Sequence, residues 1–283
     1  MSRATLSARP VVILGAARSG TKIFRDCLGV FPGVATVPYD INYVWRMGSE
    51  KLTHDEIPAS AATDATICRI RAQLARFVLG ADVLVEKTVS NCLRVEYVDR
   101  VLPDALFVHL IRDGRDVVES VERQWTEKPD YRYLAWKVRT YPWFDAPRYA
   151  LEYVPGLVRR QFGRRTGAAV WGPRYAGIQD DLLAESVQSV CARQWVRCVE
   201  LASAGLSAIP AARVATVRYE EFARDPAAVV AQVAAFAGLG SPTADFAVPV
   251  TEAHIGKGHG GIDAAALAIM RPTLQRLGYA DDI

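Results

Sequence analysis

The sequence has few cysteines, little net charge and no long apolar run, and each shortage excludes a class of protein. The five cysteines among 283 residues include no CxxC pair, so we expect neither a disulfide framework nor a cysteine-based zinc site. A formal net charge of +3 gives no general attraction to nucleic acid. No window approaches the roughly eighteen uninterrupted apolar residues of a membrane-spanning helix. We therefore expect a cytoplasmic globular protein without a nucleic-acid partner.

The chain does contain an alternation of short apolar segments and segments with helical spacing. Buried strands are predicted at residues 11–15, 83–87, 106–111 and 212–220. Helices are predicted at 20–29, 91–101, 115–123, 180–204, 227–237 and 263–277. This alternation predicts an α/β fold, a parallel sheet with helices on both faces, whose ligand lies at the carboxyl ends of the strands. We expect one domain, 1–283, with an aromatic, basic and mainly helical insertion at about 125–204.

The loop GAARSGTK (15–22) after the first strand has the glycine spacing of nucleotide-binding P-loops. Thr21 and Lys22, however, stand in the reverse of the usual Lys-Ser/Thr order, and Arg18 lies inside the loop. Backbone N–H groups at a helix N-terminus, together with cationic side chains, bind phosphate or sulfate groups. We therefore predict that an anionic group is held by Arg18, Ser19, Gly20, Thr21 and Lys22. The alternative is a purely structural glycine turn.

A second basic motif follows the predicted strand 106–111, which ends in Arg-Asp-Gly-Arg-Asp where a triphosphate enzyme would carry an acidic magnesium ligand. Arg112 lies at the strand end, and Ser120 lies about two turns into the next helix. A guanidinium and a hydroxyl placed in this way could hold one phosphate between them. The pattern favours a second anion site over a metal site. The alternative is that Arg112 and its neighbours form solvated salt bridges.

The two motifs together carry a resemblance. GAARSGTK and LFVHLIRDGRDVVES (106–120) resemble the cofactor-binding motifs of the sulfotransferases that use 3′-phosphoadenylyl sulfate (PAPS). The resemblance implies a P-loop-type fold, a first loop that wraps the 5′-phosphosulfate, and a 3′-phosphate held by Arg112 and Ser120. In this family the transferred sulfuryl group needs cationic side chains but no metal.

Three further segments resemble the bacterial and tyrosylprotein branch of this family. They are VEKTVSN (85–91), VRYEEFARDP (217–226) and HIGKGHGG (254–261). They imply that Lys87 lies near the cofactor and that Tyr219 and Lys257 contact the 3′-phosphate. Val89 departs from the proline that this branch carries at the same place.

Sulfuryl transfer needs a base for the acceptor's proton and positive charge for the leaving oxygen. Arg18 and Lys87 are the candidate cations, and Lys22 is a third. The resemblance places an acidic residue after the second strand, within 34–46, which makes Asp40 the candidate base. The match is by position only, because the family has Glu-Glu-Thr-Arg where this chain has Tyr-Asp-Ile-Asn. The alternative is that Asp40 is an ordinary turn residue.

The acceptor is predicted from residues 125–175. This window holds 12 of the 26 aromatic residues, and 10 lysines or arginines against 4 acids, a local charge of 10 − 4 = +6. Aromatic rings stack on sugars and arginines bind acidic groups, which indicates an acidic carbohydrate or glycolipid acceptor. The alternative is that these residues pack and solvate a helical subdomain. WGPRYAG (171–177) is typical of bacterial members.

Other functions fit parts of the sequence. A P-loop small-molecule kinase and a non-catalytic anion-binding protein of the same fold are the main alternatives. The basic segment YVPGLVRRQFGRR (153–165) could lie on anionic lipid, as a peripheral membrane contact. No sequence feature specifies an oligomeric state.

Overall fold

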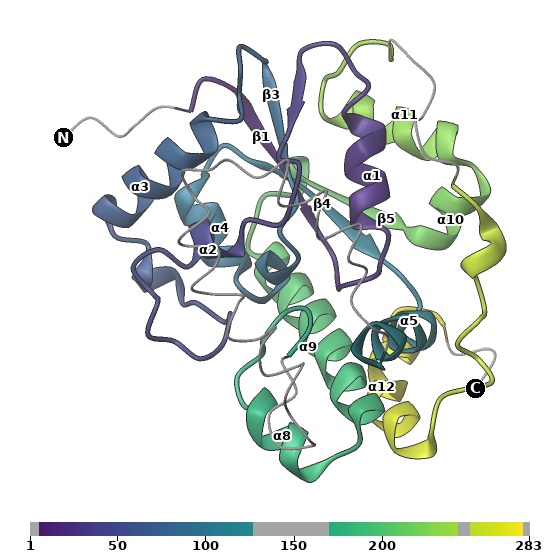
Figure 1. Ribbon diagram of the computed structural model, residues 1–283. Helices are drawn as coiled ribbons and strands as arrows, with labels where there is room; N and C mark the ends of the chain where they lie inside the picture. Colours follow the sequence, from purple (N-terminus) through teal and green to yellow (C-terminus); the bar gives the residue numbers. More distant parts are fainter. Residues whose placement is uncertain (1–5, 127–169, 243–249, 280–283) are drawn as a thin grey trace.

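Five parallel strands form one sheet at the centre of the protein (Figure 1). The computed structural model describes residues 6–126, 170–242 and 250–279. The strands are β1 (Arg9–Leu14), β2 (Val34–Thr36), β3 (Val83–Glu86), β4 (Leu106–Ile111) and β5 (Val214–Arg218). Their order across the sheet is β2-β3-β1-β4-β5. Because β1 pairs with both β3 and β4, the loops that follow these three strands open side by side at one edge.

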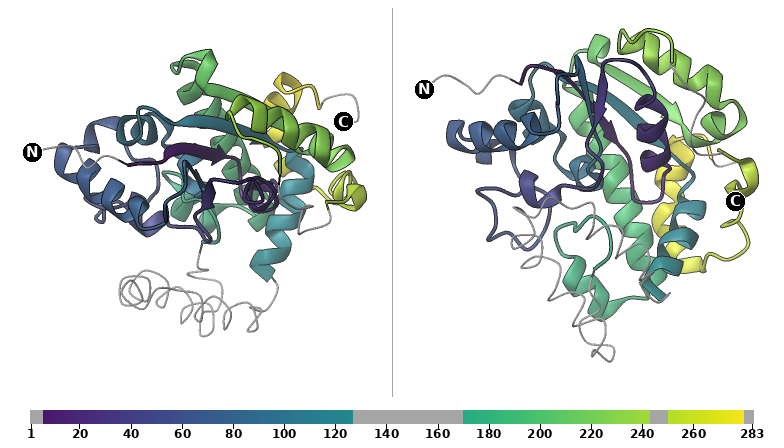
Figure 2. Two further views of the ribbon diagram at one scale, coloured as in Figure 1. Left: turned by 90° about the horizontal axis from the view of Figure 1, so that it is seen from above. Right: turned by 45° about the horizontal axis from the view of Figure 1, so that its top comes forward.

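Helices cover both faces of the sheet, as the sequence predicted (Figures 1 and 2). Val11 and Ile13 of β1 belong to the core shared with α1 (Thr21–Leu28), α10 (Tyr219–Arg224) and α11 (Pro226–Phe236). Val12 and Leu14 belong to the opposite core, because successive side chains of a strand point to opposite faces. The helices of that second core are α2 (Asn42–Trp45), α3 (Asp64–Ala75), α4 (Val95–Val101), α5 (Gly114–Thr126), α8 (Ile178–Ala184), α9 (Val187–Ser207) and α12 (Ala264–Arg276).

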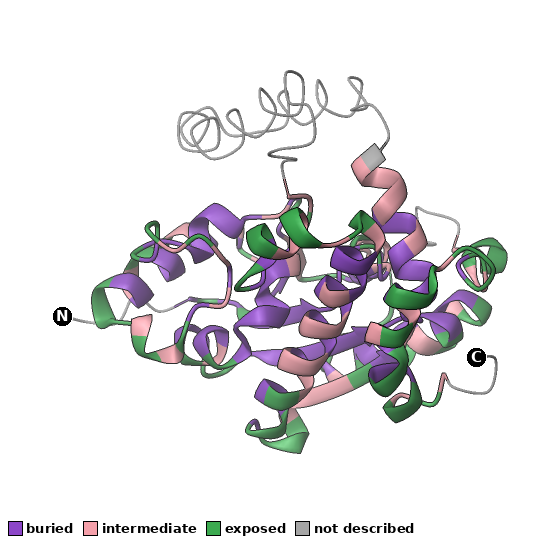
Figure 3. Ribbon diagram, turned by 90° about the horizontal axis from the view of Figure 1, so that it is seen from below, coloured by how far each residue is buried: buried purple, intermediate pink, exposed green. Residues whose placement is uncertain are grey.

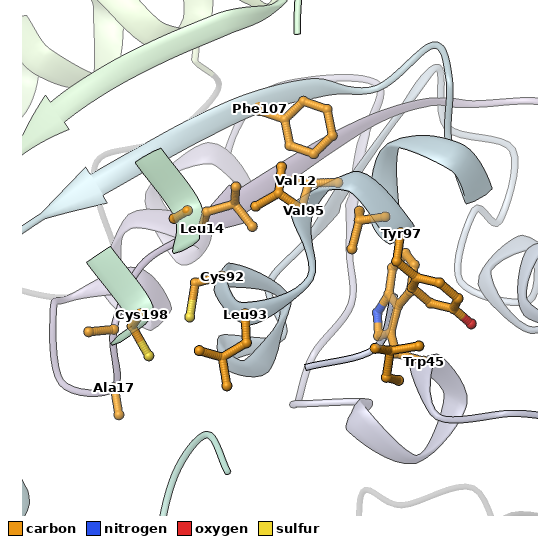
Figure 4. Close-up of a cluster of buried hydrophobic side chains, with 14 of the residues drawn as sticks. Val12, Leu14, Ala17, Trp45, Cys92, Leu93, Val95, Tyr97, Phe107 and Cys198 are labelled. Atoms are coloured by element: carbon orange, nitrogen blue, oxygen red, sulfur yellow. The ribbon is translucent and has the colours of Figure 1, made fainter. Parts of the chain in front are cut away.

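The larger core lies between the sheet and α9. Figure 4 shows Val12 and Leu14 near Cys92, and Cys198 of α9 on the far side of that thiol. Burial is continuous along the central strands in the view from below (Figure 3). A fully buried aliphatic or aromatic side chain contributes about 1.5–3 kcal/mol relative to an exposed one, so this layer supplies much of the stability.

Side-chain caps set several helix boundaries. Thr63, Ser186, Asp225 and Asp263 each accept a hydrogen bond from a backbone N–H of the first turn of α3, α9, α11 and α12. The single helix predicted at 180–204 is wrong, because the Ser186 cap begins a new helix and separates α8 from α9. The helix predicted at 91–101 also divides, into a short 3-10 helix (Val89–Leu93) and α4. Among the described helices, none has the length and apolar character needed to cross a bilayer.

The aromatic and basic window lies largely outside the described residues, since 127–169 are not among them. Of the predicted insertion 125–204, the described part includes α8 and most of α9. Helix α9 packs against α5, α4 and α12 and contributes to the main core. The insertion boundary stays a prediction.

Candidate active site

The loop between β1 and α1 makes a sharp turn in which two glycines have no room for a side chain. Gly20 has a φ of 85°, and Arg18 also lies in the left-handed region at 66°. A Cβ at Gly15 would lie 2.7 Å from the main-chain oxygen of Leu110 in β4. A Cβ at Gly20 would lie 2.6 Å from the ring of Tyr219. The loop is therefore held closely between β4 and Tyr219.

This loop leaves hydrogen-bond donors without acceptors. No side chain of the described residues caps the N-terminus of α1, and its first turn contains no acidic residue. The buried hydroxyl oxygen of Ser19 has no hydrogen-bond partner in the described part of the chain. Thr21 is buried at the first position of α1. These groups, with the positive end of the helix dipole, are suited to an anion.

Lys22 lies apart from the loop. Its side chain is 57% exposed, and its Nζ is 2.9 Å from Oδ2 of Asp26, one turn along α1. Lys22 therefore lies along the outer face of α1, away from the other predicted loop residues.

Arg112 connects three segments at the end of β4. Its guanidinium donates to the main-chain oxygens of Arg18, at 2.9 Å, and of His254, at 2.7 Å. It also lies 4.3 Å from the ring centroid of Tyr219. Arg18 Nε in turn donates to Ser120 Oγ at 2.9 Å. The structure thus brings together Arg18, Arg112, Ser120 and Tyr219, four predicted site residues from the first loop, the end of β4, α5 and α10. Arg112 Nε is buried without a partner in the described residues.

Helix α9 supports this cluster from the larger core. Trp195 Nε1 donates to the main-chain oxygen of Arg112 at 3.2 Å. A Cβ at Gly114 would lie 2.7 Å from the Trp195 indole, so the turn after Arg112 can approach the ring only with glycine.

The glycine-rich segment 254–261 folds over the start of α5. Asp116, which is buried, accepts hydrogen bonds from the N–H groups of Gly256 at 2.9 Å and Gly258 at 2.8 Å. A Cβ at Gly258 would be 2.1 Å from the main chain of α5. Lys257 is exposed, and its Nζ lies 3.4 Å from Nδ1 of His254. The predicted residue Lys257 is therefore placed close to the Arg112 cluster.

Lys87 and Asp40 meet beside the first loop. Lys87 follows β3, and burial lowers the pKa of its ammonium group, an effect that the negative charge of Asp40 opposes. Their Nζ and Oδ2 atoms are 3.9 Å apart. The Asp40 side chain is 31% exposed, and its two oxygens accept backbone hydrogen bonds from Asn42 at 3.1 Å and Val89 at 3.0 Å. This geometry fits the turn role, and it also leaves lone pairs on an oriented carboxylate that could accept a proton.

Comparison with known protein families gives a match over part of the chain. Residues 10–146, which contain the first loop, Lys87 and the second motif, match the model of the sulfotransferase family. This segment, a little under half of the chain, is therefore similar to the sulfotransferase family.

Solved sulfotransferase structures share the fold of the whole chain. The sulfotransferase domain from the curacin biosynthetic pathway is 15% identical, with a TM-score of 0.51 over 93% of this chain and 84% of that one. The sulfotransferase domain from the Synechococcus PCC 7002 olefin synthase is also 15% identical, with a TM-score of 0.54 over 96% of this chain and 97% of that one. Identities at this level establish the fold alone. No curated protein sequence matches the chain.

Asp55, which lies in none of the predicted motifs, is the centre of a buried polar network. Asp55 is 0% exposed. It accepts hydrogen bonds from Asn42 Nδ2 at 3.1 Å, Arg46 at 2.9 Å, Ser90 Oγ at 2.9 Å and the main-chain N–H of Arg174 at 2.9 Å. These partners come from α2, from the segment after Lys87 and from 171–177. Asp55 therefore fixes the segments that carry Asp40 and Lys87 relative to each other, and no motif around it indicates this.

The segment 171–177 lies beside the first loop. Gln194 Nε2 of α9 donates to the main-chain oxygens of Trp171, at 3.0 Å, and Pro173, at 2.7 Å. A Cβ at Gly172 would be 3.5 Å from the Cβ of Ala17 in the loop. Trp171 is partly exposed there. This segment is the described end of the aromatic and basic window.

Proposed function

We propose that the protein is a PAPS-dependent sulfotransferase that transfers a sulfuryl group to a hydroxyl of an acceptor, most simply a carbohydrate or glycolipid. The observation that carries the proposal is the hydrogen-bonded connection from Arg18 to Ser120 and Arg112, which joins the first loop to the second motif. Two anion-binding segments side by side suit a ligand with phosphate groups at both ends.

The donor set fits such a ligand. Ser19 Oγ and Arg112 Nε are buried donors without a partner in the described residues, and a buried unpaired donor costs about 1–3 kcal/mol. An anion that accepts from them would remove this cost. The first loop would hold the 5′ end of the nucleotide through Arg18, Ser19, Gly20 and Thr21, and Lys22 would join them by leaving its contact with Asp26. The 3′-phosphate would be held by Arg112, Ser120, Tyr219 and Lys257.

The proposed chemistry assigns three roles to side chains of this chain. When bound, PAPS supplies the sulfuryl group and its bisphosphate leaving group. Asp40 accepts the proton of the acceptor hydroxyl, and the backbone N–H groups that it accepts from hold its orientation. Lys87 and Arg18 place positive charge against the leaving oxygen, and the poor solvation of buried Lys87 strengthens that interaction. No metal takes part in the proposal.

The acceptor proposal depends on the composition of the window 125–175 and on where its C-terminal end lies. The window 125–175 is aromatic and strongly basic, which suits an acidic sugar. Its described end, at Trp171 and Arg174, lies beside the first loop with both side chains partly exposed. No observation favours the kinase alternative, since Lys22 pairs with Asp26 on the outer face of α1.

Calorimetric titration tests the donor half of the proposal. We expect the purified protein to bind 3′,5′-bisphosphoadenosine (PAP) without magnesium. Arg112→Ala should weaken this binding by more than about tenfold, because a hydrogen bond to a charged group contributes about 1.5–3 kcal/mol. Arg276→Ala, which removes a surface pair with Glu200, is the matched control and should bind as wild type does. Binding of Mg-ATP in preference to PAP would support the kinase alternative instead.

A transfer assay tests the acceptor half. The protein is incubated with PAPS that carries a radiolabelled sulfuryl group and with separated glycan, lipid and protein fractions of cells. We expect label in the glycan or glycolipid fraction, and its loss with Asp40→Asn while PAP binding is kept. Binding of PAP with no label in any fraction would favour the non-catalytic anion-binding alternative.

A further inference from the structure

His254 is a titratable group that the proposed mechanism does not use. It ends the 3-10 helix Glu252–His254 and begins the glycine-rich segment. Its main-chain oxygen accepts from Arg112, and its ring Nδ1 lies 3.4 Å from Lys257 Nζ. An ammonium group can only donate, so this contact requires a neutral imidazole with Nδ1 as acceptor. The ring therefore lies where the segment meets the Arg112 cluster.

The positive charges of four side chains act on this imidazole. They are Lys257 in the same segment, Arg112 after β4, Arg123 in α5 and Arg18 in the first loop. Two acids lie nearby. Asp116 accepts from the backbone of the segment and lies 3.8 Å from Arg112, and Glu252 lies 4.0 Å from Arg224 of α10. His254 is exposed, but partial desolvation and the charges of the four cations lower its pKa, which favours the neutral ring in the free protein.

We propose that His254 is a further ligand of the nucleotide's 3′-phosphate and that it takes up one proton from solvent when that phosphate binds. This inference rests on the proposed function. A phosphate monoester is a dianion above about pH 6. Its charge offsets the repulsion from the four cations and stabilises the imidazolium. Protonation at Nδ1 ends the contact in which Lys257 donates to the ring, so that both residues become donors to the phosphate.

The direction of the pH dependence follows from this linkage. The pKa of His254 is lowered in the free protein and raised by the phosphate in the complex. Between those two values, binding of the phosphate takes up a proton, and the affinity falls as pH rises, by at most about tenfold per pH unit for one proton. Above the pKa of the complex, the contribution of His254 to affinity is lost.

Calorimetry of the full chain with PAP measures this proton directly. Titrations at pH 7 in HEPES and in Tris, whose ionisation enthalpies differ, give the number of protons taken up per PAP bound. We expect wild type to take up a large fraction of one proton more than His254→Gln does. At pH 6 the variant should also bind PAP about tenfold more weakly than wild type, with the difference shrinking to less than about twofold by pH 8.5.

Two controls isolate the residue and the phosphate. His259→Gln removes the other histidine of the same segment, whose Nε2 lies 3.2 Å from Oδ2 of Asp113, and it should keep the proton uptake of wild type. Adenosine 5′-phosphosulfate, which lacks the 3′-phosphate, should bind without any uptake that depends on His254.

The outcomes separate this inference from the proposed function. If PAP does not bind at all, the proposed function fails. If PAP binds and His254→Gln takes up as many protons as wild type, only the role of His254 is overturned. If His259→Gln abolishes the proton uptake, the role of His254 is likewise overturned, because the proton would then belong to His259.

Discussion

Asp55→Asn is expected to destabilise the protein far more than a typical loop substitution, because this carboxylate is the charged centre of a buried network. Asp55 accepts from Arg46 at 2.9 Å and lies 3.7 Å from the Arg174 guanidinium. Asparagine keeps the shape but removes the charge. The buried Arg46 and Arg94 then lose their counter-charge in the interior.

The magnitude follows from the burial and from the pKa. Removal of one partner of a buried ion pair costs about 3–5 kcal/mol. Burial by itself would raise the pKa of Asp55, but the charges of Arg94 and Arg174 and the hydrogen bonds from Arg174 and Asn42 outweigh it and lower the pKa to about 2 from 3.8. That difference corresponds to roughly 2.5 kcal/mol, an order-of-magnitude figure, at about 1.36 kcal/mol per unit.

The sign of the pH dependence is fixed by this lowered pKa. The unfolded state binds the proton more readily, so the stabilisation is fully present above about pH 4 and is lost as pH falls toward about 2. The difference in stability between wild type and Asp55→Asn should therefore be large at pH 7 and should narrow in acid.

Urea unfolding followed by circular dichroism measures the loss of stability at pH 7. The same experiment, repeated in steps down to the acid limit of folding, measures how that loss depends on pH. Asp99→Asn is the matched control, since Asp99 pairs with Arg213 at 2.6 Å where both side chains are partly exposed, and it should lose less than about 1 kcal/mol. If Asp55→Asn costs no more than Asp99→Asn at pH 7, the reasoning about the buried network is refuted.

Two further predictions concern the active site. Gly20→Ala should destabilise the protein by about 1–3 kcal/mol and weaken PAP binding, because its Cβ would meet the Tyr219 ring at a φ of 85°. Thermal unfolding and calorimetry measure the two effects, and unchanged values in both would show that the turn tolerates a side chain. Lys87→Met, which keeps the buried stem and removes the charge, should lower turnover with PAPS by about 10²–10³ and weaken PAP binding much less. Lys51→Met, on an exposed turn, is its control, and an equal loss of turnover in the two variants would contradict a special role for Lys87.

Local patterns determined much of the fold. The strand predicted at 106–111 is β4 without a shift of either end, because burial on both faces favours a run that is apolar except for His109 and that ends before Arg112. The helix predicted at 180–204 was wrong in its continuity, since a single Ser186 hydroxyl that accepts from Ser189 N–H begins a second helix there. Caps of this kind depend on one side-chain rotamer, which hydrophobic spacing does not encode.

The residues of the candidate site could also be predicted in part from local patterns. Arg18, Arg112 and Ser120 lie in motifs with fixed spacing next to strands and helices, and the structure brings them together. Their roles, like that of Asp40, stay predictions. Asp55 and His254 could not be singled out, because what matters in each is the set of distant residues around it.

The sequence by itself determined the two loops that are predicted to bind anions, because glycine spacing, a strand before and a helix after are all local properties. Only the tertiary structure decided that these loops adjoin, since that depends on β1 pairing with β4 and on Arg112 reaching Arg18 and His254 across 94 and 142 residues. The pKa shifts of Asp55 and Lys87 were also decided there, because the arginines around Asp55 and the desolvation of Lys87 come from packing among segments that are distant in the chain.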